Sequence, residues 1–310
     1  MPTTLSTLIT PSSFALSASA VLRSTAAVLV LGTLLATPAF AADAITDVSP
    51  APEFETVPQR SVLLGGGVGV QPVYEGSDEY RVFPFPILSY DSGVDGPRRF
   101  EFRALDDIRL HALRAGGFSV GPLVGYSFGR EEDEADILEG LGDIEPGIVV
   151  GGFAAYEFAA TSTASYGFDV GVSTQVSGDI FEDEPFEDDF DYGYEIDFGV
   201  SGEFDLSPRL NLATRIGATY ASDEYMETYF GINAAQEAAA QDDSITQFDA
   251  DGGIKNAYIN VNAAFDVTDN IQLRAGAGYS RLLGDAEDSP VTVEPNQFQG
   301  SLGAAYRFRF

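Results

Sequence analysis

Tyr192-Gly193-Tyr194-Glu195-Ile196-Asp197-Phe198-Gly199-Val200-Ser201-Gly202-Glu203-Phe204-Asp205-Leu206 is the stretch that decides the fold. Apolar and polar residues alternate along it with a period of two, which is the spacing of a β-strand. A strand of a soluble sandwich also alternates, but here the apolar side carries aromatic rings toward both ends. That combination is typical of a membrane strand with rings at both interfaces and a polar lumen behind it.

The same alternation recurs in residues 166–176, 210–220, 257–267 and 271–279, without the three-to-four-residue spacing of an amphipathic helix. Beyond the N-terminal region, no apolar run approaches the ~20 residues that a membrane-spanning helix needs. Strands that cross a bilayer must close into a barrel, because open edges would leave backbone groups unpaired in lipid. The sequence therefore predicts an all-β fold, a single antiparallel transmembrane β-barrel of the outer-membrane type.

Residues 1–41 are predicted to be a cleaved signal peptide. Arg23 precedes the apolar residues 26–35, and Ala39-Phe40-Ala41 has the small-x-small pattern of a cleavage site. An uncleaved membrane anchor is the alternative. Residues 42–59 contain three prolines and are expected to form a flexible periplasmic segment, followed by the barrel in residues 60–310. We therefore expect the protein in the outer membrane of a Gram-negative bacterium.

Short and long connections alternate along the chain, which predicts the topology. Short turns are expected at residues 161–163, 207–209 and 268–270, and long loops at 131–146, 179–191, 221–251 and 284–295. Barrels of this type place short turns in the periplasm and long loops outside. If the C-terminus is periplasmic, strands can be counted backward from it. The short turns then stay periplasmic and the long loops stay outside only if residues 98–113 form two strands joined by a turn at 105–107. This predicts about twelve strands, with ten as the alternative.

The four long loops hold 28 of the 48 carboxylates in a chain of net charge −32, and they contain no Lys or Arg. Such a surface repels nucleic acid. Carboxylate oxygens attract Ca²⁺ and Mg²⁺, but the acids of residues 179–191 lack the fixed ligand spacing of a dedicated site. We expect a solvated surface that associates weakly with divalent cations among lipopolysaccharide, and no bound cofactor. The Ala-rich residues 233–241 are expected to form a short helix within the longest loop.

The C-terminus predicts a closing membrane strand. Leu302, Ala304, Tyr306, Phe308 and Phe310 alternate with residues expected to face inward, including Gly303, Arg307 and Arg309. A terminal aromatic strand resembles the signal that the barrel assembly machinery recognises as an added edge strand. The predicted assembly signal comprises Gly303, Tyr306, Phe308 and Phe310. The last strand of a soluble sheet is the alternative.

Several short motifs resemble the MipA/OmpV family of outer-membrane proteins, named for a member that interacts with a lytic transglycosylase. They lie in order from about residue 62 to the end: Tyr74-Glu75-Gly76-Ser77-Asp78, Gly129-Arg130, Leu138-Glu139-Gly140-Leu141-Gly142-Asp143, Tyr225 with Tyr229-Phe230-Gly231, Leu282-Leu283-Gly284-Asp285-Ala286-Glu287-Asp288-Ser289-Pro290, and Tyr306-Arg307-Phe308. The resemblance implies a scaffold that links a murein hydrolase to a peptidoglycan synthase. It also implies roles in adhesion, osmotic response or antibiotic uptake, so the resemblance points to several different functions.

The motif residues are expected at loop and strand ends, where they would build the loops, with a ligand-contacting rim as the alternative. Glycine at 76, 142 and 231 would permit positive φ or close chain approach, and Asp78, Asp143 and Asp285 would cap turns through their own backbone. The predicted loop and rim residues are Tyr74, Gly76, Ser77, Asp78, Gly140, Gly142, Asp143, Tyr229, Phe230, Gly231, Gly284, Asp285, Ser289 and Pro290.

An enzyme is not expected. Barrel lipases, acyltransferases and proteases use a histidine with a serine or aspartate partner. The chain has one histidine, His111, which falls in the weakest predicted strand, with Ser119 nearby in sequence. We interpret it as a rim or lumen residue. Inside the lumen, the acids Glu195, Asp197, Glu203 and Asp205 are expected to pair with Arg215, Arg274, Arg307 and Arg309.

Two functions from different classes follow from these features. A non-enzymatic scaffold at the periplasmic face is favoured by the family resemblance, with a lytic transglycosylase and a peptidoglycan synthase as partners. A small cation-preferring channel is favoured by the acidic loops and the polar lumen. A lipid-modifying enzyme is a distant third.

Overall fold

The computed structural model describes residues 60–91, 100–102, 107–161, 163–176 and 192–310. The predicted signal peptide, the segment 42–59 and the acidic residues 179–191 lie outside this part of the chain. The strands are β1 (Ser61–Pro72), β2 (Tyr80–Asp91), β3 (Phe100–Phe102), β4 (Ile108–Leu110), β5 (Leu113–Ala115), β6 (Phe118–Ser127), β7 (Gly147–Ala160), β8 (Ala164–Val176), β9 (Glu195–Ser207), β10 (Leu210–Ala221), β11 (Gly253–Asp266), β12 (Ile271–Leu282) and β13 (Asn296–Arg309).

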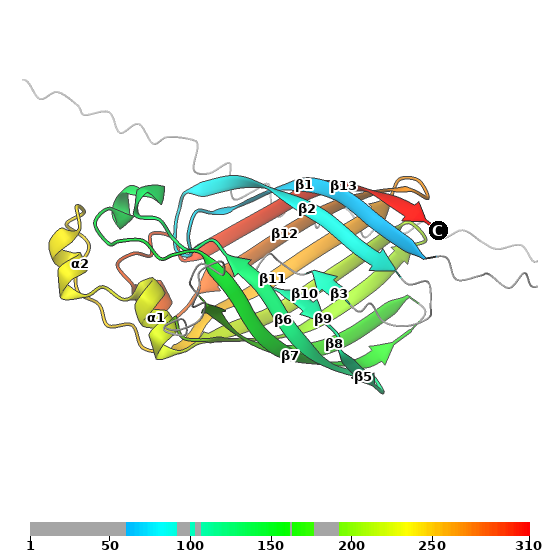
Figure 1. Ribbon diagram of the computed structural model, residues 1–310, viewed down its shortest axis with the longest axis horizontal. Helices are drawn as coiled ribbons and strands as arrows, with labels where there is room; N and C mark the ends of the chain where they lie inside the picture. The colour runs from blue at the N-terminus through cyan, green and yellow to red at the C-terminus, as the bar shows by residue number, and fades with distance from the viewer. Residues whose placement is uncertain (1–59, 92–99, 103–106, 162, 177–191) are drawn as a thin grey trace, which may run out of the picture. The chain divides into compact units, whose positions relative to one another are not determined.

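All strand pairings are antiparallel, and nearly every strand pairs with its neighbours in the chain. The exception is the closing pair, in which β1 lies against β13, with Ser61 opposite Arg309 and Val70 opposite Gly300. The pairing order therefore runs β2-β1-β13-β12-β11-β10-β9-β8-β7-β6-β4-β3, with β5 also on β6. Figure 1 shows the resulting curled sheet. The predicted antiparallel barrel fold of the outer-membrane type is confirmed.

Strands β4 and β5 occupy one position in the wall, because both pair with β6. Ile108 lies opposite Val124 in β4, whereas Leu113 lies opposite Val120 in β5, so the register changes by one residue between them. One extra residue in one strand is a β-bulge, which turns the following side chains to the other face. Counting β4 and β5 together gives twelve strand positions among the described residues, as predicted, rather than ten. The predicted turn at 105–107 falls mostly outside the described residues.

The alternation in sequence corresponds to the two faces of the wall. In β9, Phe198 and Val200 are 42% and 54% exposed on the outer face, whereas Asp197 is bonded to Arg215 and Tyr258 on the inner face. In β13, Leu302, Tyr306 and Phe308 are exposed on the outer face, whereas Arg307 reaches Asp266 on the inner face. The predicted apolar outer surface and polar interior are confirmed on these strands.

Short and long connections alternate as predicted, and the long ones hold the helices. These are η1 (Glu132–Glu134), η2 (Asp136–Leu138), α1 (Asp223–Phe230), α2 (Ala234–Ala239) and α3 (Asp285–Asp288). The Ala-rich segment forms α2, which begins at an Asn233 capping box with Gln236. Among the described residues, no helix is long and apolar enough to cross a membrane. Figure 1 places α1 and α2 at the end of the sheet opposite the C-terminus.

Candidate functional site: an ion-paired lumen and a packed loop cap

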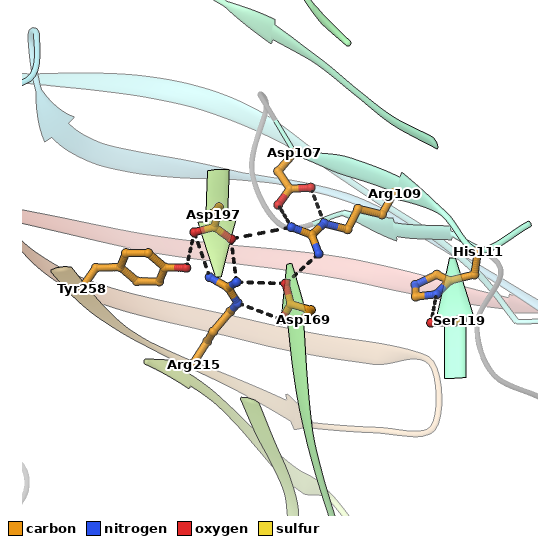
Figure 2. A network of polar contacts seen from close by, with 8 residues as sticks. All are labelled: Asp107, Arg109, His111, Ser119, Asp169, Asp197, Arg215 and Tyr258. Carbon is orange, nitrogen blue, oxygen red and sulfur yellow. Dashed lines mark hydrogen bonds and ion pairs between the residues drawn. The ribbon is translucent and has the colours of Figure 1, made fainter. Parts of the chain in front are cut away.

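Arg109 of β4 is the centre of a charged network inside the barrel (Figure 2). Its side chain is completely buried. The guanidinium donates from Nε to Asp107 Oδ1 at 2.7 Å, from NH2 to Asp107 Oδ2 at 2.8 Å and from NH1 to Asp169 Oδ2 at 2.7 Å. It lies 5.0 Å above the ring of Phe153. Arginine suits this place because its planar fork of donors binds two carboxylates at once.

Arg215 of β10 extends the network to the neighbouring strands. It donates to Asp169 Oδ2 of β8 at 2.9 Å and to Asp197 Oδ1 of β9 at 2.6 Å. Tyr258 of β11 donates its hydroxyl to the other oxygen of Asp197 at 2.5 Å. Arg109 NH2 also lies 3.7 Å from Asp197 Oδ1. The network therefore joins β4, β8, β9, β10 and β11 through side chains that point into the lumen (Figure 2).

Three carboxylates and two guanidinium groups make up this network, so the charges nearly balance. Such groups are costly to take out of water unless they are paired and hydrogen-bonded. Here both arginines bind two or more carboxylates, which offsets that cost. The bonds join β4 to the adjacent strands β8 to β11 across the inner face of the wall.

The predicted lumen pairing is correct in part. Asp197 pairs with Arg215 as expected. Arg307 instead binds Asp266 at 3.1 Å, and Glu195 binds Lys255 at 2.5 Å. Arg309 donates to the Asp269 carbonyl oxygen, Arg274 donates to Gln272 Oε1, and Asp205 accepts from Asn211. Glu203 is exposed.

Sequence reasoning missed the two most buried members of the network, Arg109 and Asp169. Asp169 stands at an inward position of the predicted strand 166–176, between Phe168 and Val170, so the alternation could have revealed it. Arg109 lies just before the bulge between β4 and β5, where the period of two is interrupted and carries no signal.

His111 lies in the lumen, which is one of the two expected positions, and its contact with Ser119 was not predicted from the sequence. The bulge places His111 Nδ1 3.1 Å from Ser119 Oγ, and the imidazole ring meets Phe153 edge-on at 4.8 Å between centroids. Ser119 is 7% exposed. A serine and a histidine are two components of a hydrolytic site. The structure thus confirms the lumen position of His111 and adds a partner to it.

Lys255 of β11 forms a second ionic cluster toward the loop end of the barrel. Its ammonium group lies 2.8 Å from Glu75 Oε2 and 2.5 Å from Glu195 Oε1. It also donates to Tyr225 Oη at 3.1 Å and lies 4.6 Å from the centroid of that ring. Glu75 follows β1, Glu195 begins β9 and Tyr225 is in α1. One buried cation therefore ties two loops to two strands.

Above this cluster, the long connections pack together into what we call the loop cap, comprising residues 73–79, 128–146, 222–252 and 283–295. Its core contains Tyr74, Leu138, Leu141, Ala221, Met226, Phe230, Ile232, Ile245, Ala250, Leu282, Ala286 and Val291. Phe230 and Leu138 are completely buried, and burying such a side chain contributes about 1.5–3 kcal/mol. These connections leave the barrel at β1–β2, β6–β7, β10–β11 and β12–β13, so their shared core crosses the mouth.

The predicted loop and rim residues meet in this cap. Tyr74 donates its hydroxyl to the Val291 carbonyl at 3.0 Å, and Ser289 donates to the Phe230 carbonyl at 2.6 Å. Ser77 is 1% exposed, and its carbonyl accepts from Gln297 Nε2 at 3.1 Å. Motif residues therefore form hydrogen bonds with one another (Ser289 with Phe230) and, across more than 200 positions, with residues next to other motifs (Tyr74 with Val291), which favours the structural interpretation of the motifs.

Two glycines of the motifs have a clear conformational reason. Gly76 has φ +101°, and its carbonyl accepts from both Val293 N and Glu294 N at 2.8 Å. Gly140 has φ +91°, and a Cβ there would lie 2.2 Å from the Ala239 carbonyl oxygen. Gly142 and Gly284 also have positive φ. Gly231 does not, since its φ is −72°, but a Cβ would lie 2.5 Å from Glu227 O, so close approach explains it.

The expectation that the motif aspartates cap their own turns is wrong for two of them. Asp143 accepts from Glu132 N at 2.8 Å, and Asp285 accepts from Asp251 N at 2.8 Å. The first bond spans the connection between β6 and β7, and the second joins the loop after β10 to the loop after β12. Asp78 and Pro290 lie in the cap, and Asp78 is exposed. Tyr229 donates its hydroxyl to Gln175 Oε1 at 2.7 Å.

Burial changes the titration of several cap residues. Desolvation raises the pKa of Tyr74 from 10.0 to about 12, and it raises the pKa of Tyr229 as well. It lowers the pKa of Arg130, which is 4% exposed and donates from NH1 to the Tyr229 carbonyl at 2.9 Å. The core of the cap therefore favours neutral forms, whereas most of the described loop acids are exposed, as expected from the sequence.

Loop acids also serve the cap as hydrogen-bond acceptors. Glu132 Oε2 accepts from the backbone N–H groups of Gly140 and Gly142 at 3.2 and 3.3 Å. Asp223 Oδ1 accepts from Gly252 N at 2.8 Å. Within the described ranges, no group of three or more His, Cys, Asp or Glu residues could hold a metal ion.

The predicted assembly residues lie along β13. Tyr306, Phe308 and Phe310 are 46%, 49% and 70% exposed on the outer face. Gly303 lies on the inner face, where a Cβ would be 2.6 Å from Ile87 Cδ1, so its lack of a side chain makes room for Ile87. Their role in assembly stays a prediction.

Comparison with known proteins points to one family. Residues 64–308 match the family described as "MltA-interacting protein MipA". A 100-residue stretch is 27% identical to the putative outer membrane protein YiaT of Escherichia coli K12, covering 32% of this chain. That alignment spans 39% of the relative, well under half of its length. The same figures hold for YiaT of Escherichia coli O157:H7.

Solved structures of outer-membrane barrels are also similar. An outer-membrane channel from Pseudomonas putida F1 is 14% identical with a TM-score of 0.38, and the match covers 85% of this chain and all of that one (100%). The NanC porin is 7% identical with a TM-score of 0.35, over 79% of this chain and 98% of that one.

Proposed function

Because this chain belongs to the MltA-interacting protein MipA family and is an outer-membrane β-barrel protein, we propose that it is a non-enzymatic, non-conducting scaffold. In this role it holds a murein hydrolase, and a peptidoglycan synthase with it, at the periplasmic face of the outer membrane. The observation that supports the proposal is the pair of packed features inside and above the barrel, the Arg109–Arg215 network and the apolar core of the loop cap, which on this proposal together block the lumen.

The obstruction supports a scaffold because a channel needs a continuous water-filled path. The network sets fully and largely buried charges across the lumen, with Arg109 0% and Asp169 3% exposed. Removing one partner of a buried ion pair destabilises the fold by roughly 3–5 kcal/mol, because the other charge is left buried and unpaired. The loop cap adds a second barrier whose core is apolar. A scaffold, in contrast, needs only a rigid barrel and an accessible end.

The short turns define the end at which partners would bind. Barrels of this type carry short turns on the periplasmic side. Two of these turns join β9 to β10 and β11 to β12. The second is braced by Arg307 and Arg309, which both donate to the Asp269 carbonyl. These turns offer a fixed surface on the side where peptidoglycan lies, and the predicted periplasmic segment 42–59 is the second proposed contact.

A cation-preferring channel remains the second candidate, favoured by the 28 loop carboxylates. Charges of one sign near a pore mouth concentrate the opposite ion, and salt screens this effect over about 10 Å at 0.1 M. A channel would therefore show a cation preference that fades as ionic strength rises. A scaffold would show no conductance at any ionic strength.

The test combines conductance with binding. The full-length purified protein should give no steps in a planar bilayer, and it should retain a lytic transglycosylase in a pull-down. Deleting residues 43–57 should weaken that pull-down and leave the barrel assembled. Neutralising the acids of residues 179–191 is the matched control and should leave binding intact. Salt-sensitive cation conductance without hydrolase binding would contradict the scaffold and favour the channel.

The enzymatic alternative is tested at Ser119. A fluorophosphonate probe labels serines that a histidine has activated. We expect no labelling above the Ser119→Ala variant, because the proposed scaffold performs no chemistry. Labelling of the native protein that disappears in Ser119→Ala would instead assign a hydrolytic site to the lumen.

A further inference from the structure

The inner face of β11, β12 and β13 carries a patch of uncharged residues, which we call the amide patch. One row across the three strands consists of Asn260, Gly278 and Gln299, and the next row consists of Asn262, Gly276 and Ser301. The alternate residues Phe298 and Leu302 of β13 are 53% and 65% exposed on the outer face. Because side chains alternate along a strand, both rows face the lumen.

The glycines of β12 leave the middle of the amide patch open. A Cβ at Gly278 would lie 2.5 Å from Gln299 Nε2 and closer still to Asn260 Oδ1. A Cβ at Gly276 would lie 2.6 Å from Ser301 Oγ. The side chains of β11 and β13 therefore lean over β12 from both sides, into space that a larger residue would occupy. Glycine within a strand can mark a place where another group approaches closely.

The two rows differ in their hydrogen bonding. In the first row, Gln299 Nε2 donates to Asn260 Oδ1 at 2.9 Å. In the second row, the side chains of Asn262 and Ser301 form no hydrogen bond with any residue that the structure describes. Asn262 and Gln299 are also exposed to solvent within the lumen. An amide offers two donors and an acceptor with two lone pairs, so the amide patch presents unused hydrogen-bonding groups to the lumen.

Two phenylalanine rings border the amide patch on the side of β1 and β2. Gly69 of β1 lies opposite Ser301 on one side and Phe83 on the other. A Cβ at Gly69 would lie 2.5 Å from Phe83 Cζ, so the ring of Phe83 lies over β1 toward Ser301. The ring of Phe85 lies over Gly67 in the same way, and the two ring centroids are 6.3 Å apart. Both phenylalanines are only half-buried, so aromatic surface stays accessible beside the amides.

Charged side chains border the amide patch but do not enter it. Arg215 lies opposite Asn260 and is bound to two aspartates of the network. Arg274 lies two positions before Gly276 on β12 and donates to Gln272 Oε1 at 2.9 Å. An ion placed between these borders would lose water without gaining a free counter-charge, which is costly. The amide patch therefore complements a polar molecule that carries no charge.

We propose that the amide patch and the two phenylalanine rings bind an uncharged saccharide. The hydroxyl groups of a sugar donate and accept hydrogen bonds, as the amides do, and its C–H groups pack on the electron-rich face of an aromatic ring. Asn262 lies beyond the level of Arg215 toward the turn at 268–270, so the saccharide enters from the end with the short turns. The inference goes beyond the scaffold function and does not depend on it.

Tryptophan fluorescence measures this binding, because the chain has no tryptophan of its own. Phe83→Trp keeps an aromatic ring beside the amide patch and reports on a sugar that stacks there. Phe298→Trp is the matched control, since Phe298 precedes Gln299 on β13 and lies on the outer face. Each full-length variant is folded in an amine-oxide detergent, which has no sugar headgroup, and is titrated with the tetramer of N-acetylglucosamine or of glucose. Assembly is checked by heat-modifiable gel mobility.

We expect the emission of Phe83→Trp to change saturably with at least one of the tetramers, and the emission of Phe298→Trp to stay constant. Adding Asn262→Leu should weaken binding by about threefold to tenfold, which corresponds to one neutral hydrogen bond. Adding Gln247→Leu, which removes an exposed amide of the loop cap, should leave binding unchanged. Because the ligand is uncharged, binding should not fade as ionic strength rises.

Two further measurements protect the test against a damaged variant. Calorimetric titration of the native protein shows whether Phe83→Trp has itself changed the binding, and Ser301→Val replaces Asn262→Leu if that variant does not assemble. Binding of only one tetramer would support the proposal and identify the class of sugar. No saturable binding of either tetramer would overturn it, and so would binding that Asn262→Leu and Ser301→Val both leave unchanged.

Discussion

At the scale of single residues, Arg109 shows how a charged side chain is stabilised in the interior of the barrel. It binds Asp107 through two hydrogen bonds and Asp169 through one, and it stacks over Phe153. Each contact satisfies a different part of the guanidinium. Lysine could not reproduce this arrangement, because an ammonium group is a point charge without a planar fork of donors.

Arg109→Met should therefore destabilise the barrel by about 3–5 kcal/mol, since it leaves buried carboxylates unpaired. Chemical unfolding in phospholipid vesicles measures this change. Adding Asp169→Asn to Arg109→Met should restore part of the loss, because one of the unpaired charges is removed. A loss below about 1 kcal/mol, typical of an exposed pair, would contradict the importance of the network.

Phe198 and Glu203 test the facing of β9. Phe198→Arg puts a cation on the lipid face and should cost up to about 2–4 kcal/mol, depending on its depth. Asp197→Asn is a poor lumen control, because Asp197 binds Arg215 and Tyr258. Glu203→Gln is better, since Glu203 is an exposed inward residue, and its effect should stay within about 0.5 kcal/mol. Equal costs in vesicle unfolding would mean that the two faces are assigned incorrectly.

Tyr74 gives the loop cap a dependence on alkaline pH. Its pKa is raised from 10.0 to about 12 by burial, so the folded cap favours the neutral phenol. That contribution to stability is fully present below pH 10 and is lost as the pH rises toward 12. The ultraviolet absorbance of tyrosinate should show a late step, and Tyr74→Phe should diminish it. A Tyr74→Phe curve that matches the native one would contradict the burial of this phenol.

At the scale of elements, β13 is the strand on which closure depends. It pairs with β12 on one side and β1 on the other. Its final residues oppose the start of β1, with Leu64 opposite Tyr306 and Val62 opposite Phe308. Losing this end would expose a strand edge to lipid, where backbone groups have no alternative partner.

Deleting Tyr306–Phe310 should accordingly block membrane assembly, as read from heat-modifiable mobility of outer-membrane fractions. Phe308→Leu with Phe310→Leu is the matched control, because it keeps the strand and its apolar face but removes aromatic rings. Assembly of the control would attribute the defect to pairing, whereas failure of both would attribute it to the aromatic signal. Normal insertion of the truncated chain would show that this end is dispensable.

At the scale of the whole molecule, the proposed function treats the network and the loop cap as two barriers in series along one lumen. The loop cap is held by its apolar core and by the Lys255 cluster, and the network is held by Arg109 and Arg215. The two share no described side chain, so each should persist when the other is weakened.

Conductance in a planar bilayer tests this arrangement. Phe230→Asp puts a charge into the core of the cap and should open that barrier alone, leaving the protein silent. Arg109→Ala with Arg215→Ala should remove the network and leave the cap closed. The combined variant should conduct, provided that it shows native heat-modifiable mobility. Full conductance of the Phe230→Asp variant would mean that the network does not obstruct the lumen.

The amino-acid pattern alone was enough to predict the strands, which side of each faces lipid, and the order of their pairing. Period-two alternation in residues 192–206 depends only on which side of a strand touches lipid, and Phe198 and Asp197 obey it in the structure. Loop lengths likewise predicted the order of turns, and the Ala-rich composition of residues 233–241 predicted the helix Ala234–Ala239. These features are local, so a linear pattern is enough to specify them.

The residues that fill the barrel and those that cover it became evident only from the folded chain. The inward position of Arg109 lies beside a bulge, where the alternation of residues gives no signal. Its partner Asp169, and Arg215 which also binds Asp169, lie on strands far along the chain. The loops expose most of their acids as expected, and they also bury Leu138 and Phe230 in a common core that the sequence did not predict. Strand closure brings distant loops to one mouth, and the cost of leaving apolar residues in water then packs them together.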